Sequence, residues 1–267
     1  MPYSHANGVK IHYEKVGEGP AMVLLHGHPY DHDEWLFQTA HFSSWFTVIG
    51  IDIRGYGRSE PDTGDYDLTD MADDVLGVMN DEGVDAAVLM GCSMGSRLAL
   101  YLCQQEPARF CALVAVGANS KPSNRAQKNI DGFLQKGIKG YHKEYIEELI
   151  APGFEKTRLG RYLLDMFLER GPGLNAEAIA QTFRASSLAI DCTPGLTAMT
   201  MPVLVINGAL DHALEGGKKS AALIPGAVHR IIPGTGHSCP LEDPATFDRY
   251  VIEFLSGHGL MPAIKTK

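Results

Sequence analysis

Short runs of apolar residues without alternation recur along this chain. The clearest are Ala21 to Leu25, Phe46 to Ile53, Ala86 to Met90, Ala112 to Ala118, Val203 to Asn207 and Val228 to Ile232. Runs of this kind predict strands that are covered on both faces, and hence a largely parallel sheet. Val9 to Val16 alternates in the manner of a strand, and Gly17-Glu18-Gly19-Pro20 indicates a turn after it.

Helical patterns lie between most of these predicted strands. One set of apolar residues falls on a single helical face: Leu68, Met71, Ala72, Val75 and Met79. The last helix is clearly marked, with Asp243 as N-cap, Pro244 at its first position and Gly257 as its stop. Strands that alternate with helices build βαβ units, so the pattern predicts the α/β class with a mostly parallel open sheet.

The alternation stops between about Asn119 and Thr200, where no convincing strand occurs. Three or four helices fit this stretch: Asn124 to Lys136, Lys143 to Ile150, Thr157 to Arg170 and Ala176 to Ala189, separated at Gly140, Pro152-Gly153 and Gly171-Pro172-Gly173. We expect residues 119–200 to form a helical cap over the strand ends, where ligands bind in open α/β sheets. Residues 1–118 and 201–267 would then form the core domain.

The same stretch is rich in aromatic residues. They are Phe133, Tyr141, Tyr145, Phe154, Tyr162, Phe167 and Phe183. Each of them, taken singly, favours core packing over pocket lining. As a group they allow a mostly apolar pocket beneath the predicted cap.

Composition and charge narrow the function classes. The chain has 267 residues, of which 45% are hydrophobic, and a net charge of -9 with no cluster of Lys or Arg. We therefore expect neither nucleic acid nor an anionic membrane as a partner. The N-terminus lacks the basic and apolar segments of a signal peptide, and no apolar run approaches membrane-spanning length, which predicts a cytoplasmic protein. The sequence leaves the oligomeric state open between monomer and dimer.

Residues 86–105 carry the strongest chemical signal. An apolar run ends in Gly91-Cys92-Ser93-Met94-Gly95, where an amphipathic run begins. A strand that turns sharply into a helix would place Ser93 at a helix N-terminus, whose unpaired N–H groups and positive dipole suit attack on a carbonyl. Cys92 is one place off the centre of G-x-S-x-G, which favours a packing role. All five cysteines lack C-x-x-C spacing, which favours reduced thiols over disulfides or a zinc site.

A serine nucleophile needs a base, and the base needs an orienting acid. His237 follows the strand residues Ile231-Ile232 on a Gly-rich loop, a mount that can reach across to another strand end. Asp211 lies just beyond the strand that begins at Val203, where it can meet a histidine of the next loop. His212 is an alternative base, but adjacent residues cannot readily pair, so Asp211 with His237 is preferred. Other histidines have no reactive neighbours in the sequence: His5, His12, His41, His142 and His258.

Taken together, these motifs resemble the α/β-hydrolase family over nearly the whole chain. Ser93, Asp211 and His237 follow the family's order of nucleophile, acid and histidine. The segment from Asp52 to Ser59 is similar to the family's D-x-R-G-x-G-x-S loop, whose residues indicate loop architecture. The insertion at 119–200 is similar to its helical cap.

The resemblance also extends to an oxyanion loop. His26-Gly27-His28-Pro29 is similar to the family's H-G-x-P motif. It implies that the backbone N–H groups of His28 and Met94 form the oxyanion hole. The chain departs from the family pattern at two positions, with His28 in place of an apolar or small residue and Ser96 in place of a frequent glycine.

The type of residue at the position of Ser93 indicates which reaction a member of the family catalyses. Members that resemble dehalogenases and epoxide hydrolases carry Asp at this position, whereas serine suits acyl transfer through an acyl-enzyme. We therefore expect a carboxylic ester hydrolase that acts on a small ester or lactone, without cofactor or metal. Carbon–carbon hydrolases of ring-cleavage products and cofactor-free haloperoxidases share the same residues and stay as alternatives.

Two further classes are less favoured. A metal hydrolase would draw on His26, His28, Asp31 and His32, but this spacing is one residue longer than the H-x-H-x-D-H zinc motif. Asp33-Glu34-Trp35 instead indicates a helix start. A ligand-sensing receptor on the same scaffold is disfavoured by a complete set of Ser, Asp and His.

Overall fold

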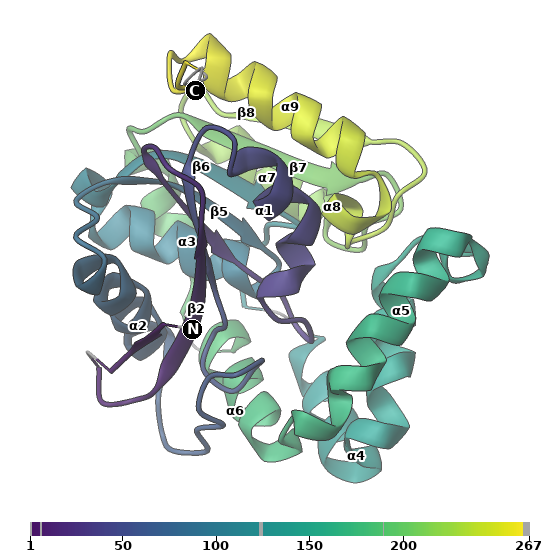
Figure 1. Cartoon of the computed structure of the whole chain (residues 1–267). Coiled ribbons are helices and arrows are strands. Elements are labelled where there is room, and N and C mark those ends of the chain that lie inside the picture. Colours follow the sequence, from purple (N-terminus) through teal and green to yellow (C-terminus); the bar gives the residue numbers. More distant parts are fainter. Residues whose placement is uncertain (1, 6, 123–124, 189, 264–267) are drawn as a thin grey trace.

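A single twisted sheet organises the protein. The computed structural model describes residues 2–5, 7–122, 125–188 and 190–263. Their strands pair in the order β1-β2-β4-β3-β5-β6-β7-β8 (Figure 1). The strands are β1 Tyr3–Ser4, β2 Ile11–Val16, β3 Ala21–Leu25, β4 Thr47–Ile51, β5 Ala87–Cys92, β6 Phe110–Val116, β7 Val203–Gly208 and β8 Val228–Ile232. From β4 to β8 all neighbouring strands in this order are parallel, whereas β2 is antiparallel to both of its neighbours, β1 and β4.

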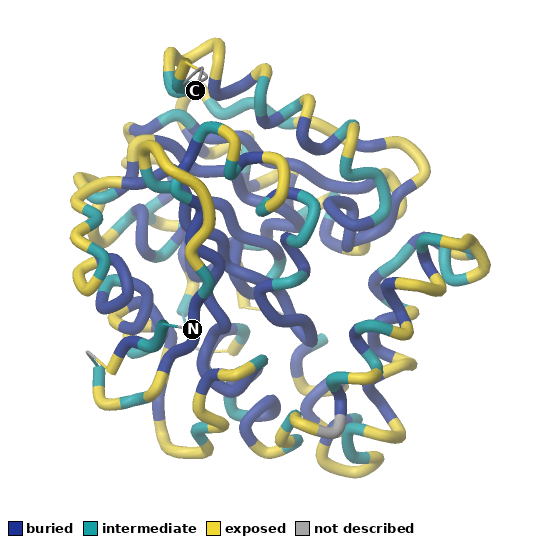
Figure 2. Tube along the Cα trace, in the orientation of Figure 1, coloured by how far each residue is buried: buried dark blue, intermediate teal, exposed yellow. Residues whose placement is uncertain are grey.

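Helices cover both faces of this sheet. They are α1 Leu36–Phe42, α2 Leu68–Asp81, α3 Met94–Gln105, α4 Ala126–Leu149, α5 Arg158–Arg170, α6 Ala176–Ser187, α7 Leu214–Leu223, α8 Cys239–Glu242 and α9 Pro244–Gly257. Met22 and Leu24 of β3 pack with α1 and α9, whereas Val23 and Leu25 pack with α2 and α3. Because successive strand residues point to opposite faces, one fully apolar strand serves both layers. Figure 2 accordingly shows the central strands buried along their length and exposure on the outer turns.

The expected mostly parallel sheet is confirmed. Ala21–Leu25 and Val228–Ile232 have the predicted bounds, and the other apolar runs differ from their strands by a few residues at each end. Pro244–Gly257 is helical as predicted, and Asp243 Oδ1 accepts a hydrogen bond from Thr246 N at 3.1 Å. The predicted amphipathic helix that begins at Leu68 is α2, and the apolar face that the sequence indicated is buried.

The inserted helices α4 to α6 lie between β6 and β7. The predicted break between the helices 124–136 and 143–150 is present within α4, but it lies at Gly137, where φ is 65° and ψ is 179°, rather than at Gly140. Glycine adopts a positive φ without steric penalty, so the chain bends there and the helix resumes. Two predicted helix ends, Asn124 and Ala189, lie outside the described residues. The division into core and cap domains stays a prediction.

None of the helices in the described ranges is long and apolar enough to cross a membrane. The expectations of a cytoplasmic location and of no nucleic-acid partner stay predictions.

The turn from β5 to α3 brings three backbone segments into close contact. Ser93 has φ 53° and ψ −110°, a conformation that costs roughly 1–3 kcal/mol for a residue with a side chain. A Cβ on Gly95 would overlap the carbonyl oxygens of Leu25 and His26, and one on Gly91 would overlap Gly95 itself. Glycine on both sides of Ser93 is therefore a steric requirement of this turn.

Gly95→Ala tests this requirement. We expect the added methyl group to push β3 and α3 apart and to lower the free energy of unfolding by about 1–3 kcal/mol or more. Denaturant unfolding of the purified variant measures the loss. Gly257→Ala is the matched control, because no atom lies within 4 Å of its added Cβ, and its stability should match or slightly exceed that of the parent. Equal stability of the two variants would contradict the argument.

Candidate active site

Ser93 stands at the carboxyl edge of the sheet, between β5 and α3. Its N–H donates to the carbonyl oxygen of Val116 at 2.8 Å, which ties the turn to the neighbouring strand β6. The side chain is half-buried and lines a cavity of about 160 Å³. A Cβ on Gly27 would come within 2.9 Å of Ser93 Cβ, so the β3 loop lies directly against the serine.

Asp211 and His237 meet at the ends of β7 and β8. His237 Nδ1 lies 2.7 Å from Asp211 Oδ1, and both side chains are buried. Asp211 also accepts hydrogen bonds from Ala213 N and Asn207 Nδ2, each at 2.7 Å. Burial alone would raise the pKa of Asp211, but the charge and hydrogen bonds of His237 and these donors outweigh burial and hold it well below its usual range. Asp211 is therefore ionised and fixes the proton of His237 on Nδ1.

His237 is held from two sides. Its backbone N–H donates to Leu149 O, at the end of α4, at 2.7 Å. A Cβ on Gly117 would lie 2.5 Å from His237 Cε1, so the ring rests against bare backbone. His237 Nε2 is buried and has no hydrogen-bond partner within the described part of the chain. The free nitrogen lines the same cavity as Ser93, and an acceptor for a hydroxyl proton is thus available there.

The protonation of His237 follows from its partners. Burial would lower the pKa of His237, but the negative charge and hydrogen bond of Asp211 raise it above its ordinary value of 6.5. The other candidate base, His212, has a pKa lowered to about 3 by burial and by the nearby charge of His237. His212 Nδ1 lies 3.8 Å from Asp211 Oδ1, beyond hydrogen-bonding distance. The geometry therefore favours His237 over His212 as the base.

The loop after β3 carries the predicted oxyanion residue His28. Its side chain stacks on Phe183 of α6, with ring centroids 3.6 Å apart. Nδ1 accepts from Tyr56 Oη at 2.5 Å, and Nε2 donates to Ser186 Oγ at 3.2 Å. Burial lowers the pKa of His28 well below its usual value, so the ring is neutral. His28, which departs from the family pattern, thus connects the loop after β3 to the inserted helix α6.

The two amides that the resemblance implies for an oxyanion hole are those of His28 and Met94. Both residues line the cavity that contains Ser93. Neither backbone N–H donates to another group among the residues that the structure describes. Met94 is the first residue of α3, so its N–H belongs to the unpaired amides of a helix N-terminus. Their role stays a prediction.

Glu34 is a residue of this region that the sequence did not point out. It is buried, and its Oε2 accepts from Gly27 N at 2.6 Å, one residue before His28. Burial raises the pKa of Glu34 to about 7, although the Gly27 hydrogen bond opposes this rise. Its charge also raises the pKa of His237. Cys92 is buried beside it with a pKa raised well above the usual value, which excludes a thiolate nucleophile at neutral pH.

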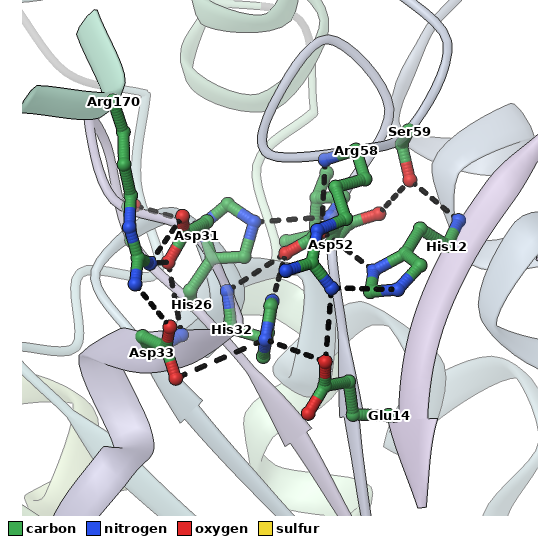
Figure 3. Close-up of polar contacts among 12 residues, drawn as sticks. His12, Glu14, His26, Asp31, His32, Asp33, Asp52, Arg58, Ser59 and Arg170 are labelled. Carbon is green, nitrogen blue, oxygen red and sulfur yellow. Dashed lines mark hydrogen bonds and ion pairs between the residues drawn. The ribbon is translucent and has the colours of Figure 1, made fainter. Parts of the chain in front are cut away.

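A second buried carboxylate, Asp52, lies beside the loop that follows β3 (Figure 3). Asp52 Oδ1 accepts from His32 N and His32 Nδ1 at 2.8 and 2.7 Å, and Oδ2 accepts from His12 Nδ1 and Arg58 N at 2.8 and 2.9 Å. Burial would raise the pKa of Asp52, but these donors outweigh it and keep the pKa far below its ordinary value. Backbone N–H of Ile53 donates to His26 Nε2 at 3.0 Å. The loops after β3 and β4 are thereby locked together.

Two groups of side chains have the spacing that a metal ion needs. The ligand atoms of His12, His32 and Asp52 lie within 4.8 Å of one another, as do those of Asp211, His212 and His237. In both groups the carboxylate already accepts hydrogen bonds from imidazole N–H groups at 2.7–2.8 Å. The sequence-predicted alternative of His26, His28, Asp31 and His32 is not such a group in the described residues, because His26 and His28 use both ring nitrogens elsewhere.

The cavity is more polar than the aromatic residues of the insertion indicated. Of those aromatics, only Tyr145 and Phe183 line it. Phe133 and Phe167 are buried in the core, while Tyr162 is 62% exposed. Polar and charged side chains make up most of the remaining wall: His28, Arg97, Asn119, Lys121, Arg125, Asn129, Ser187, His212 and His237. The mostly apolar pocket that the sequence allowed is therefore not the cavity at Ser93, because aromatic spacing on helices predicts burial without telling which part of the interior the rings enter.

Comparisons with known proteins place this geometry in context. A family model described as the alpha/beta hydrolase fold matches residues 20–244. A non-heme chloroperoxidase, CPO-A1 of Kitasatospora aureofaciens, is 27% identical over 94% of this chain and 97% of its own. A bifunctional esterase/perhydrolase of Acinetobacter calcoaceticus is also 27% identical, over 93% of this chain and 97% of its own.

Solved structures give the same picture. The enol-lactonase of Burkholderia xenovorans LB400 superposes with a TM-score of 0.90 at 25% identity, covering 96% of this chain and 100% of that one. A thermophilic esterase of Thermogutta terrifontis superposes with a TM-score of 0.85 at 26% identity, covering 93% and 94%. The predicted fold class is thereby confirmed.

The pKa of His237 sets the first prediction for this site. Only the neutral imidazole can accept a proton, so kcat/KM for an ester should rise with pH through an ionisation above pH 6.5. In Asp211→Asn this rise in kcat/KM should occur at lower pH, because the charge that raises the pKa of His237 is gone. The plateau should fall on the order of 10³-fold or more. A rise at the same pH in Asp211→Asn would contradict the assignment.

Glu34 gives a second prediction, on stability. Its pKa is about 7 when folded and 4.5 when unfolded, so the folded state holds a proton that the unfolded state has lost. The contribution of this proton to the free energy of unfolding is fully present below pH 4.5. It is lost as pH rises through 7, which lowers the free energy of unfolding by about 3 kcal/mol. Glu34→Gln should therefore be stabilised relative to the parent at pH 8 more than at pH 4.5, as measured by denaturant unfolding.

The exposed Glu147→Gln is the matched control for this comparison. Its stability relative to the parent should not change with pH in the same range. If the stability of Glu34→Gln relative to the parent changes with pH no more than that of Glu147→Gln, the pKa of Glu34 is not raised in the folded protein.

Proposed function

Since the chain belongs to the α/β-hydrolase fold family, we propose that it is a serine hydrolase that cleaves a small carboxylic ester or lactone through an acyl-enzyme. The observation that carries the proposal is the convergence of three distant side chains. Ser93 and His237 line one cavity, and Asp211 holds the histidine at 2.7 Å. The esterase and lactonase names of similar proteins favour the same substrate class.

The first half of the reaction forms a covalent ester. His237 Nε2 takes the proton of Ser93 Oγ while that oxygen attacks the substrate carbonyl carbon. The carbonyl oxygen becomes an oxyanion, which the N–H groups of His28 and Met94 stabilise. When the tetrahedral intermediate collapses, the bond to the leaving oxygen breaks. His237 then gives its proton to that oxygen, and Asp211 stabilises the imidazolium throughout.

The second half restores the enzyme. Water gives a proton to His237 Nε2 and attacks the acyl carbon, and collapse returns the proton to Ser93 Oγ and releases a carboxylic acid. For a lactone, the leaving hydroxyl stays attached to the acyl group, so a single hydroxy acid is released. Glu34 is placed to hold the peptide N–H of Gly27, and through it the orientation of the next amide.

Perhydrolysis is a second candidate that specific relatives favour. The chloroperoxidase and the esterase/perhydrolase named above align with nearly the whole chain. Hydrogen peroxide in place of water would attack the same acyl-enzyme and release a peracid, with no change in the roles of Ser93 or His237. Both activities therefore require the same serine. Likeness to carbon–carbon hydrolases of about 20% identity shows the fold alone.

Ser93→Ala tests the proposal. Labelling by a fluorophosphonate should disappear, and turnover of p-nitrophenyl butyrate and of a simple lactone should fall about 10³-fold or more. Halide oxidation in the presence of acetate and hydrogen peroxide should fall together with ester hydrolysis. Ser187→Ala is the control, because Ser187 lines the same cavity and should keep both labelling and turnover. Persistent turnover in Ser93→Ala would refute the mechanism.

A further inference from the structure

The wall of the Ser93 cavity has the opposite charge to the protein as a whole. The chain carries 32 acidic and 23 basic residues. Among the described residues that line the cavity, however, Arg97, Lys121 and Arg125 are cationic and none is Asp or Glu. A cavity lined by one sign of charge, with low-dielectric walls, focuses the field and concentrates ligands of the other sign. We call these three side chains the cationic wall.

Arg97 is the buried member of the cationic wall. It lies one helical turn beyond Ser93 on α3 and is 4% exposed. Its guanidinium donates to the carbonyl oxygens of Asn119, Lys121 and Ile190. No carboxylate pairs with it in the described ranges, and its Nε is buried without a partner. Burial lowers the pKa of Arg97, and the nearby Asp191 carboxylate opposes this effect, so the guanidinium stays protonated. Its positive charge therefore lies in the cavity wall, held by three carbonyl oxygens without a direct ion pair to a described carboxylate.

Lys121 and Arg125 stand on the segment that leads from β6 into α4. The Lys121 ammonium is exposed and makes no ion pair with a described residue. Arg125 Nη2 binds Glu148 Oε2 at 3.0 Å, and Glu148 is shared with Lys128 at 2.5 Å. One carboxylate thus serves two cations. The charge of Arg125 also reaches the candidate base, because it lowers the pKa of His237.

A buried amide adds a directional donor to this wall. Asn129 is 4% exposed and lines the cavity. Its Oδ1 accepts from Tyr141 Oη at 3.0 Å, which leaves the Nδ2 amide hydrogens without an acceptor in the described part of the chain. A donor of this kind, on the same cavity wall as two cationic side chains, is an arrangement that can bind a carboxylate by charge-assisted hydrogen bonds.

We infer that the natural substrate of this chain is an ester or lactone that carries a second, anionic carboxylate, bound by the cationic wall. The inference rests on the proposed serine hydrolase function and adds a substrate class to it. Lys121 and Arg125 contact the carboxylate, and Asn129 Nδ2 donates to it. Arg97 does not contact the carboxylate, because its Nη groups already donate to backbone carbonyls. It contributes through the electrostatic field of its charge and by fixing the carbonyls of Asn119 and Lys121. Because Ser93 lines the same cavity as Lys121, Arg125 and Asn129, a short chain suffices to join the carboxylate to the carbonyl that Ser93 attacks.

Matched substrates test the inference. p-Nitrophenyl hydrogen glutarate carries a carboxylate, and p-nitrophenyl methyl glutarate is its neutral analogue with the same leaving group. We expect kcat/KM to be about 10–100-fold higher for the acid, mainly through KM, because a charge-assisted hydrogen bond discriminates by that much. Added salt should weaken this preference, since the binding charges are partly exposed.

Charge variants locate the effect. In the double variant Lys121→Gln with Arg125→Gln, the ratio of kcat/KM for the acid to kcat/KM for the neutral analogue should fall about tenfold or more, mainly through KM for the acid. Both substrates are compared on the pH plateau of each variant, because Arg125 also lowers the pKa of His237. Lys128→Gln is the control, because it removes a nearby positive charge that pairs with the same Glu148 but does not line the cavity. Lys121→Glu should shift preference toward the neutral ester. Calorimetry of monomethyl glutarate binding to Ser93→Ala gives a readout that needs no turnover.

The outcomes separate the two proposals. Equal kcat/KM for acid and neutral esters, or an equal loss for both in the double variant, would overturn the anionic substrate while Ser93 labelling and turnover leave the hydrolase intact. An unchanged Kd for monomethyl glutarate in the double variant on the Ser93→Ala background would overturn it as well. Absence of both labelling and ester turnover in the parent would instead overturn the proposed function.

Discussion

Contact between bare backbones at the carboxyl edge of the sheet is the constraint on which the site depends. Gly95 lies against the Leu25 and His26 carbonyls, and Gly27 lies against Ser93. Gly117 lies in the same way against the His237 ring. These contacts leave no room for side chains, so strands β3, β5 and β6 end at one shared point. The positive φ of Ser93 is tolerated because this packing over-determines the turn.

Buried carboxylates then fix the loops that emerge from this edge. Asp52 accepts four hydrogen bonds and stays ionised, so it holds the β3 and β4 loops rigidly. Glu34 accepts a single amide hydrogen bond, and burial keeps its pKa near 7. Glu242 behaves like Glu34, with a pKa raised to about 7 by burial, and it binds Gly236 N and Ala151 N at 2.9 and 2.8 Å. Four donors thus outweigh burial at Asp52, whereas burial outweighs the one or two backbone donors at Glu34 and Glu242.

The sequence predicted the sheet well because its strands are buried on both faces and therefore apolar throughout. The sequence also identified Ser93, Asp211 and His237 as candidate catalytic residues, because each follows a predicted strand and the strand ends of a parallel sheet share one edge. It did not mark β1 or α7, whose short segments carry little periodicity, and it marked only the start of the helical segment that leads into α1, at Asp33-Glu34-Trp35. His12 was set aside as a residue without chemical company, yet it binds Asp52, 40 positions away in the chain. Glu34 was noted only as part of a helix start, because local pattern gives no measure of burial.

The inserted helices are joined to the reacting groups at three separate points. Leu149 O at the end of α4 accepts from His237 N, Ser186 and Phe183 of α6 hold the His28 ring, and Arg170 of α5 binds Asp31 at 2.8 Å and Asp33 at 2.6 Å. Figure 3 shows Arg170 reaching Asp31 and Asp33 to the left of the Asp52 cluster. Two of these contacts reach the segment that follows β3, which carries His28, and one reaches His237. A shift of α4 or α6 would therefore change the alignment of His237 or His28 before it changed the sheet. Since Arg125, Asn129 and Phe183 also line the cavity, the helices that would sense the substrate are those that position the groups acting on it.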